Sequence, residues 1–206
     1  RHAVPWLSDN FPQAVAKLTQ TLEALSAPHF EPYLPDCRFS LAQAHILAEN
    51  FDLATSQLDQ NKQYFAQRED QLGQWYYHIL NLNLYRRQGK TSLASEQLEK
   101  AQAIAAPHQA PVYQGLMLFY QAYLNITGYG HLQEAVALFQ EAMSYFRQTD
   151  LRLMEAQCYN GLYQAYSNLG QLKQAADSLN TARGIYKPYQ IPGLLADNLL
   201  EHGRLA

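Results

Sequence analysis

Residues 159–182 read YNGLYQAYSNLGQLKQAADSLNTA, and within this stretch Ala175 is followed four residues later by Leu179. The same pair, an alanine and then Leu or Phe four residues on, occurs at four earlier places. The five alanines are Ala14, Ala54, Ala94, Ala135 and Ala175, at separations of 40, 40, 41 and 40 residues. A period of this size, with small and large residues in phase, is typical of a helix-turn-helix unit stacked on itself. The chain is therefore predicted to be an all-α solenoid of antiparallel helix pairs.

The composition of the 206-residue chain favours an ordered interior and excludes two classes of partner. Hydrophobic residues make up 48% of the chain, which is enough to bury a continuous core. The formal net charge is −3 and no long block of Lys or Arg occurs, so the electrostatic basis for binding nucleic acid or an anionic membrane is missing. No apolar run reaches the ~20 residues that a transmembrane helix needs. Protein or extended peptide is therefore the expected partner.

Alignment of the chain on its own period predicts where each helix begins and ends. The residue five before each repeated alanine marks a turn, and it is glycine at Gly89, Gly130 and Gly170. Glycine suits this place because a helix often ends with one residue in the left-handed conformation. The expected second helices of the pairs are 9–25, 51–66, 91–106, 131–147 and 172–186. The expected first helices are 36–48, 69–88, 110–126 and 151–169.

These helices predict one solenoid over residues 1–206, with four complete repeats at 36–66, 69–106, 110–147 and 151–186. The array begins with an unpaired second helix at 9–25 and ends in an apolar stretch, 191–206, that predicts a further first helix or a cap. Solenoid ends ordinarily carry polar capping helices. We therefore expect a fragment of a larger protein, or self-association through the C-terminal helix.

An insertion of about three residues interrupts the period between Leu124 and Gly130. With a shift of three, Tyr123 aligns with His45, Tyr85 and Tyr166 of the other repeats. The insertion either projects a contact loop from the surface or extends the helix that precedes it.

The chain resembles the tetratricopeptide repeat family, most closely in its last complete repeat. The residues that carry the resemblance are Tyr159, Leu162, Tyr166, Gly170, Leu172, Ala175, Leu179 and Ala182. Departures are Tyr163 in place of a small residue, and Asn61 and Thr21 in place of alanine. The period of about 40 exceeds the basic ~34 of the family. It is similar to that of the long-period subgroup found in maltose-activator-type bacterial regulators, quorum-peptide receptors and kinesin light chains. The resemblance implies a right-handed α-α superhelix.

In this family, partners are expected to bind the concave face, which is formed by the first helices. Eleven residues before the repeated alanine of each complete repeat, with the shift of three in the third, stand the amides Gln43, Asn83, Gln121 and Gln164. Amides can pair with the main chain of an extended peptide, although they are also ordinary occupants of helix surfaces. The other residues expected on this face are Phe39, Tyr76, Arg86, Arg87, Gln114, Met117, Asn125, Asn160 and Asn168.

Only Arg86 and Arg87 are basic in this set, which argues against the carboxylate clamp that some family members use to grip chaperone C-termini. The pair could bind one acidic side chain or phosphate. Alternatively, it complements the dipole at a solvated helix end.

Residues suited to catalysis or to metal and cofactor binding do not form a recognisable pattern. Cys37 and Cys158 occupy equivalent positions three repeats apart, too far for a disulfide in a solenoid, and are expected to be buried. The seven histidines show no metal-ligand spacing, and His45 is expected to pack between helices. We expect no cofactor, no metal and no catalytic site.

Three functions are compatible with the sequence. The first is a sensor or interaction arm of a larger bacterial regulator, such as a transcription activator or a nucleotide-cyclase or kinase fusion. The second is a passive scaffold that assembles other proteins without switching. The third, a helical enzyme, is least favoured because no acid-base or nucleophile cluster converges. A cytoplasmic location is expected, with an extracytoplasmic sensor region as the alternative.

Overall fold

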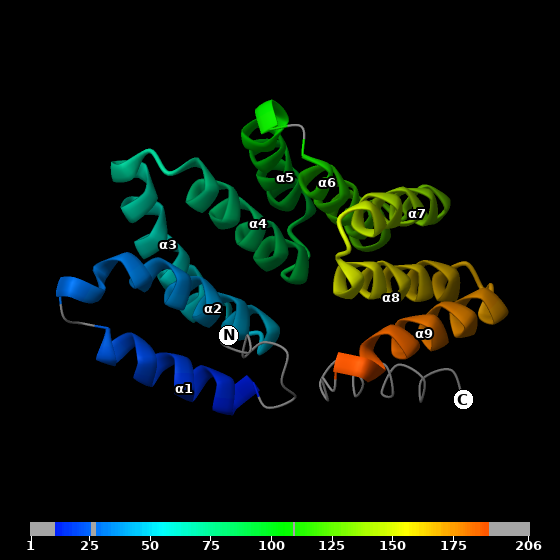
Figure 1. The fold of residues 1–206 in the computed structure, drawn as a ribbon. Coiled ribbons are helices and arrows are strands. Elements are labelled where there is room, and N and C mark those ends of the chain that lie inside the picture. Colours follow the sequence, from blue (N-terminus) through cyan, green and yellow to red (C-terminus); the bar gives the residue numbers. More distant parts are fainter. Residues whose placement is uncertain (1–10, 26–27, 109, 190–206) are drawn as a thin grey trace. The chain divides into compact units, whose positions relative to one another are not determined.

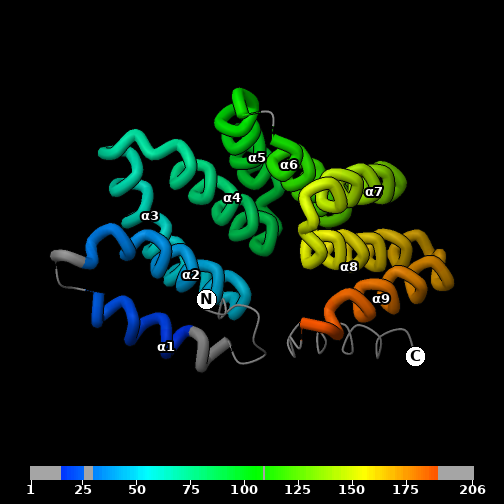
Figure 2. The backbone as a smooth tube through the Cα atoms, in the orientation of Figure 1, coloured from blue at the N-terminus to red at the C-terminus, as the bar shows by residue number. Residues whose placement is uncertain are grey.

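The computed structural model describes residues 11–25, 28–108 and 110–189, which form helices joined by short turns with no strand among them (Figure 1). The chain divides into two compact units, one that runs to Ile104 and one that starts at Ala105. Within each unit, successive helices reverse direction at each turn (Figure 2). Among the described residues, no helix combines the length and the apolar character needed to span a bilayer.

The α-helices of the first unit are α1 (Phe11–Ala24), α2 (Leu34–Leu47), α3 (Phe51–Arg68), α4 (Gln71–Arg87) and α5 (Thr91–Ala105), with the 3-10 helix η2 (Pro28–Tyr33) before α2. After the 3-10 helix η3 (Ala106–His108), the second unit contains α6 (Pro111–Leu124), the π-helical turn η4 (Asn125–Tyr129), α7 (Leu132–Gln148), α8 (Arg152–Asn168), α9 (Leu172–Tyr186) and the 3-10 helix η5 (Lys187–Tyr189).

The prediction of an all-α fold is confirmed, and each α-helix lies within two residues of its predicted bounds. The stretch 191–206, predicted as a further helix or cap, lies outside the described residues. The single solenoid over the whole chain stays a prediction, since each compact unit is described by itself.

Four of the five repeated alanines lie in the core. Ala54, Ala94, Ala135 and Ala175 are all 0% exposed, and the Leu or Phe four residues after each of them is at most 3% exposed. A small residue allows the two backbones to approach, and the large residue one turn later fills the space beside it. The period read from the sequence is therefore the packing period of the core.

The turns between the paired helices have the predicted left-handed residue. Gly89, Gly130 and Gly170 have φ of 70°, 71° and 73°, and Glu49 at the corresponding place has φ of 60°. In the turns at Glu49, Gly89 and Gly170, the backbone amide of the next residue donates to a carbonyl five residues back. An example is Lys90 N to Tyr85 O at 2.9 Å. This bond satisfies a carbonyl that the end of the helix leaves open.

The insertion extends helix α6 as the π-helical turn η4. Here the amide of His131 donates to Asn125 O at 3.0 Å, six residues back instead of five, so this turn holds one residue more than the others and not the three predicted. Tyr129 at its end is 44% exposed, but the segment remains helical. Of the two alternatives, helix extension is therefore correct.

Candidate functional site

Two rows of amides lie on the first helices of the second unit. Gln114 and Gln121 stand on α6, and Gln157, Gln164 and Asn168 stand on α8. The spacings of seven and four residues place each row on one side of its helix. Helices α6 and α8 contact each other directly, so the two rows stand on adjacent first helices. We call these five residues the amide surface; all are exposed or half-buried.

The amide surface has unused hydrogen-bonding capacity. The side chains of Gln114, Gln157, Gln164 and Asn168 make no hydrogen bond to another described residue. Gln121 Nε2 makes only a long contact, 3.5 Å, to Asn125 Oδ1. Gln157 was absent from the predicted set, although its spacing of seven from Gln164 could have identified it.

Two residues predicted on the binding face are instead buried, and a third is half-buried and bonded to a neighbouring helix. Met117 is 7% exposed and Asn125 is 2% exposed, so neither side chain presents a surface to a partner. Asn160 Nδ2 donates to Tyr186 Oη at 3.0 Å and so joins α8 to α9. The reason lies in the helical angle: Met117 is three residues after Gln114, about 60° around the helix from the amide row.

The corresponding face of the first unit carries both amides and aromatic rings. Gln43 on α2 and Asn83 on α4 are half-buried and make no side-chain hydrogen bond to a described residue. The ring of Phe39 lies 6.0 Å from that of Tyr76, which is 48% exposed. Since α2 contacts α4, these side chains share one face of the unit.

The basic pair at the end of α4 is not an open anion site. Arg87 Nη1 lies 3.7 Å from Glu49 Oε1, so its charge already has a partner at the neighbouring turn. Arg86 is half-buried. This arrangement fits a pair that complements the dipole at the end of α4 better than a pair that recognises an acidic ligand.

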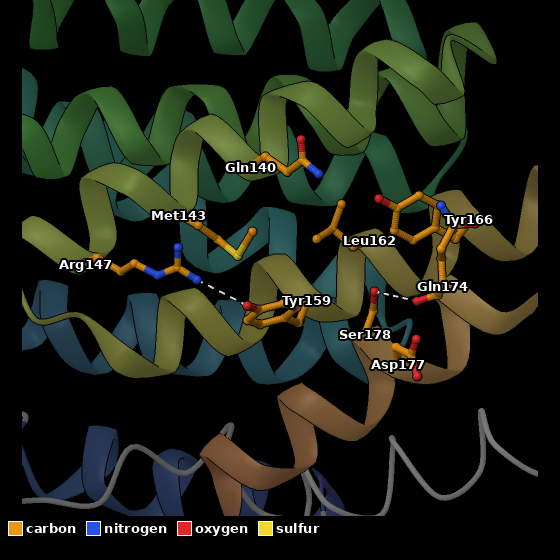
Figure 3. A pocket seen from close by; sticks show the side chains of 9 residues that line it. All are labelled: Gln140, Met143, Arg147, Tyr159, Leu162, Tyr166, Gln174, Asp177 and Ser178. Atoms are coloured by element: carbon orange, nitrogen blue, oxygen red, sulfur yellow. Dashed lines mark hydrogen bonds between the residues drawn. The ribbon is translucent and has the colours of Figure 1, made fainter. Parts of the chain in front are cut away.

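A groove of about 380 Å³ lies elsewhere on the second unit, between α7 and α9 with α8 as its floor (Figure 3). Its lining residues are Gln140, Met143, Arg147, Tyr159, Leu162, Tyr166, Gln174, Asp177 and Ser178. No pattern in the sequence predicts this groove. Its bulky residues coincide with the core positions of the repeat, so the sequence contains no signal that separates them from ordinary packing.

An ion-pair cluster stands at the Arg147 end of this groove. Glu155, which is 4% exposed, accepts from Arg147 Nε and from Arg152 Nη1, both at 2.8 Å. Arg147 Nη2 also donates to Tyr159 Oη at 3.2 Å, and the hydrogen bond that Arg147 donates to Glu155 raises the pKa of the guanidinium. Two cations share one carboxylate, so the cluster carries one surplus positive charge.

Neither cysteine is suited to nucleophilic chemistry. Both thiols are free and buried. Burial raises the pKa of Cys37, and burial together with the nearby Glu155 carboxylate raises that of Cys158. Thiolates, the reactive form, are therefore suppressed. The described residues contain no group of three or more His, Cys, Asp or Glu side chains placed to hold a metal ion.

His45 packs in the first unit, at 5% exposure and with no partner for Nδ1 among the described residues. Burial lowers the pKa of this imidazole below its usual value. As the pH falls through about 6.5, the unfolded chain binds a proton at His45 more readily than the folded chain does, so stability is lost on acidification by at most ~1.4 kcal/mol per pH unit.

We expect His45→Leu to reduce this pH dependence. Urea unfolding of wild type and variant at pH values from seven down to five measures it. His108→Leu, at an exposed histidine, is the control and is expected to retain the wild-type slope. Equal slopes for the wild-type and His45→Leu chains would show that His45 is protonated in the folded state.

Comparison with known proteins identifies the fold. No protein-family model matches the chain, and no curated protein matches its sequence. BtubC (BKLC) from P. vanneervenii aligns with a TM-score of 0.64 and 19% identity, over 95% of this chain and 82% of that protein. A signal-transduction ATPase with numerous domains and a tetratricopeptide repeat sensor, from Pyrococcus horikoshii, aligns with a TM-score of 0.64 and 17% identity. That alignment covers 91% of this chain but 29% of the ATPase. The likeness shows the fold alone, an all-α solenoid of tetratricopeptide-like repeats.

Proposed function

We propose that this chain is a peptide-binding tetratricopeptide module of the long-period subgroup, and that the amide surface binds the main chain of an extended segment of a partner protein. The observation that carries the proposal is that four of the five amide side chains on α6 and α8 make no hydrogen bond to a described residue. A peptide strand offers an alternating series of N–H donors and C=O acceptors, and an amide can pair with either.

The dimensions of the helix layer suit such a segment. Neighbouring helix axes lie about 8–10 Å apart. That distance corresponds to about three residues of extended chain. One amide row on each of two helices can therefore hold one strand at two points without reading its side chains. Uncharged rows also avoid the desolvation cost of burying an ionised side chain.

A wider biological role can be proposed from the fold. We propose that the module is the sensor or interaction arm of a larger bacterial regulatory or signalling protein, and we assign no catalytic step to this region. The archaeal ATPase that shares the fold is described as carrying a tetratricopeptide repeat sensor, which supports a sensing role. Ligand-dependent output of the full-length protein would support this role. Binding without any change of output would favour a passive scaffold.

Replacing Gln121 and Gln164 together by Ala is expected to weaken binding of an extended peptide about tenfold to thirtyfold, since each lost hydrogen bond contributes about 1 kcal/mol. The probes are peptides without charged side chains, selected on the wild-type chain from a random display library, and binding is measured by calorimetry. Methylation of their main-chain nitrogens should have a similar effect. The melting temperature is expected to change little, because neither side chain is buried.

Gln133→Ala is the matched control, an exposed amide on α7 away from the amide surface. It should leave affinity unchanged. Unaltered affinity in the double variant would remove the amide surface as the binding site. A large fall in melting temperature would show that the two side chains support the core.

A further inference from the structure

The groove between α7 and α9 lies on a different side of α8 from the amide surface. Tyr159, Leu162 and Tyr166 line the groove, whereas Gln157 and Gln164 belong to the amide surface. At 100° per residue the two sets stand roughly half a turn apart on the helix. A partner in the groove therefore need not compete with a peptide on the amide surface, and the following inference does not depend on the proposed function.

The floor of the groove is apolar and adaptable. Met143 and Leu162 are 5% and 3% exposed, and the half-buried rings of Tyr159 and Tyr166 stand beside them (Figure 3). Methionine adjusts its shape to different side chains at low cost. The volume of about 380 Å³ is at the small end of the range for ligand pockets and accommodates one large apolar side chain with its neighbours.

One end of the groove is positive. The cluster of Arg147, Glu155 and Arg152 carries a surplus positive charge, and Arg147 is held in place by its bonds to Glu155 and Tyr159. Its Nη1 group donates to no described residue. A guanidinium that is already oriented, with N–H groups to spare, is suited to a carboxylate.

The α9 wall presents acceptors. Asp177 is exposed and forms no ion pair with a described residue. The Ser178 hydroxyl donates to Gln174 O at 2.8 Å, so its remaining capacity is to accept. This wall is therefore complementary to a cation.

We propose that the groove binds a short segment of a partner protein in which an acidic, a large apolar and a basic side chain follow one another. The carboxylate lies at Arg147, the apolar side chain lies on Met143 and Leu162, and the basic group lies at Asp177. The opposite charges at the two places set the direction in which the segment binds. The groove thus reads side chains, whereas the amide surface reads the main chain.

Selection from a random-peptide display library on the full 206-residue chain tests this proposal. The expected consensus contains an acidic, an apolar and a basic position. Asp177→Lys should lower the affinity for the wild-type consensus peptides about tenfold. A selection on this variant should yield an acidic residue in place of the basic one. Asp59→Lys, which makes the same charge change at an exposed site on α3, should leave both affinity and consensus unchanged.

Arg147→Lys tests the other end of the groove. It keeps the charge beside Glu155 but removes the planar guanidinium. The affinity for peptides that carry the acidic residue should therefore fall several-fold. A selection without paired acidic and basic positions would overturn the proposal, as would an Asp177→Lys chain with wild-type preference. If the Gln121/Gln164 double variant no longer binds the consensus peptides, their binding site is the amide surface instead of the groove. Binding of those peptides to the double variant with wild-type affinity would support the groove even if the proposed function fails.

Discussion

Replacing Ala135 by Leu is expected to lower the free energy of unfolding by about 2–3 kcal/mol, measured as a fall in the urea midpoint at unchanged slope. Ala135 is 0% exposed and belongs to the core cluster that includes Phe119, Tyr123 and Phe139. A leucine there adds three carbon atoms where α6 and α7 approach, and the surrounding rings leave no volume for them. Ala175→Leu, at the same place in the next repeat, should behave alike.

Ala137→Leu is the matched control for this effect. Ala137 lies on the same helix two residues later and is exposed, so the same substitution there meets no packed neighbour. Its free energy of unfolding should change by less than about 0.5 kcal/mol. If Ala135→Leu proved as harmless as Ala137→Leu, the packing register of the repeat would be wrong.

Replacing Gly161 by Ala is expected to destabilise the chain by about 2 kcal/mol, although alanine is the better helix former by about 1 kcal/mol. A Cβ atom at Gly161 would lie closer than 3.0 Å to three atoms of the Phe139 ring. Phe139 is itself 0% exposed, so the ring cannot move aside without disturbing the core. The steric cost is therefore expected to exceed the gain in helix propensity.

Gly184→Ala measures the gain in helix propensity without a steric clash. Gly184 lies in α9, and a Cβ atom there meets nothing within 4 Å, so the substitution should stabilise the chain by up to about 1 kcal/mol. Phe139→Leu in the Gly161→Ala background should recover part of the lost stability, because it removes the ring that the new methyl group meets. Destabilisation of equal size at both glycines would refute the steric explanation.

The helices could be predicted because their signals are local and repeated. The recurrence of Ala135 and Phe139 at one period, and glycine at Gly89, Gly130 and Gly170, identify where helices pack and where they reverse. The ends of α3 and α7 are harder to predict from the sequence. Glu69 and Asp150 have φ of 52° and 53° there, although neither is glycine, because the packing of the flanking helices holds the backbone in that conformation.

The candidate site was predictable only in part. The amides Gln121 and Gln164 occur at a fixed distance from the repeated alanine, and both are half-buried in the structure. That they bind a partner stays a prediction. Met117 was assigned to the same face and is buried, since an assignment by repeat position does not resolve angles of about 60° around a helix. Asn160 was also assigned there, but its bond to Tyr186 depends on a residue 26 positions away.

The sequence by itself determined the fold class, the helix bounds to within two residues, the glycine turns and the core positions of the repeated alanines. All of these follow from helical periodicity and from the backbone preferences of alanine and glycine. Only the tertiary structure decided that Glu155 joins Arg147 to Arg152, that Gly161 lies against Phe139, and that α7, α8 and α9 leave a groove between them. The physical reason is that the volume of a groove and the charge at a surface depend on how side chains from several helices pack together. The sequence of one helix shows only which of its own residues are apolar.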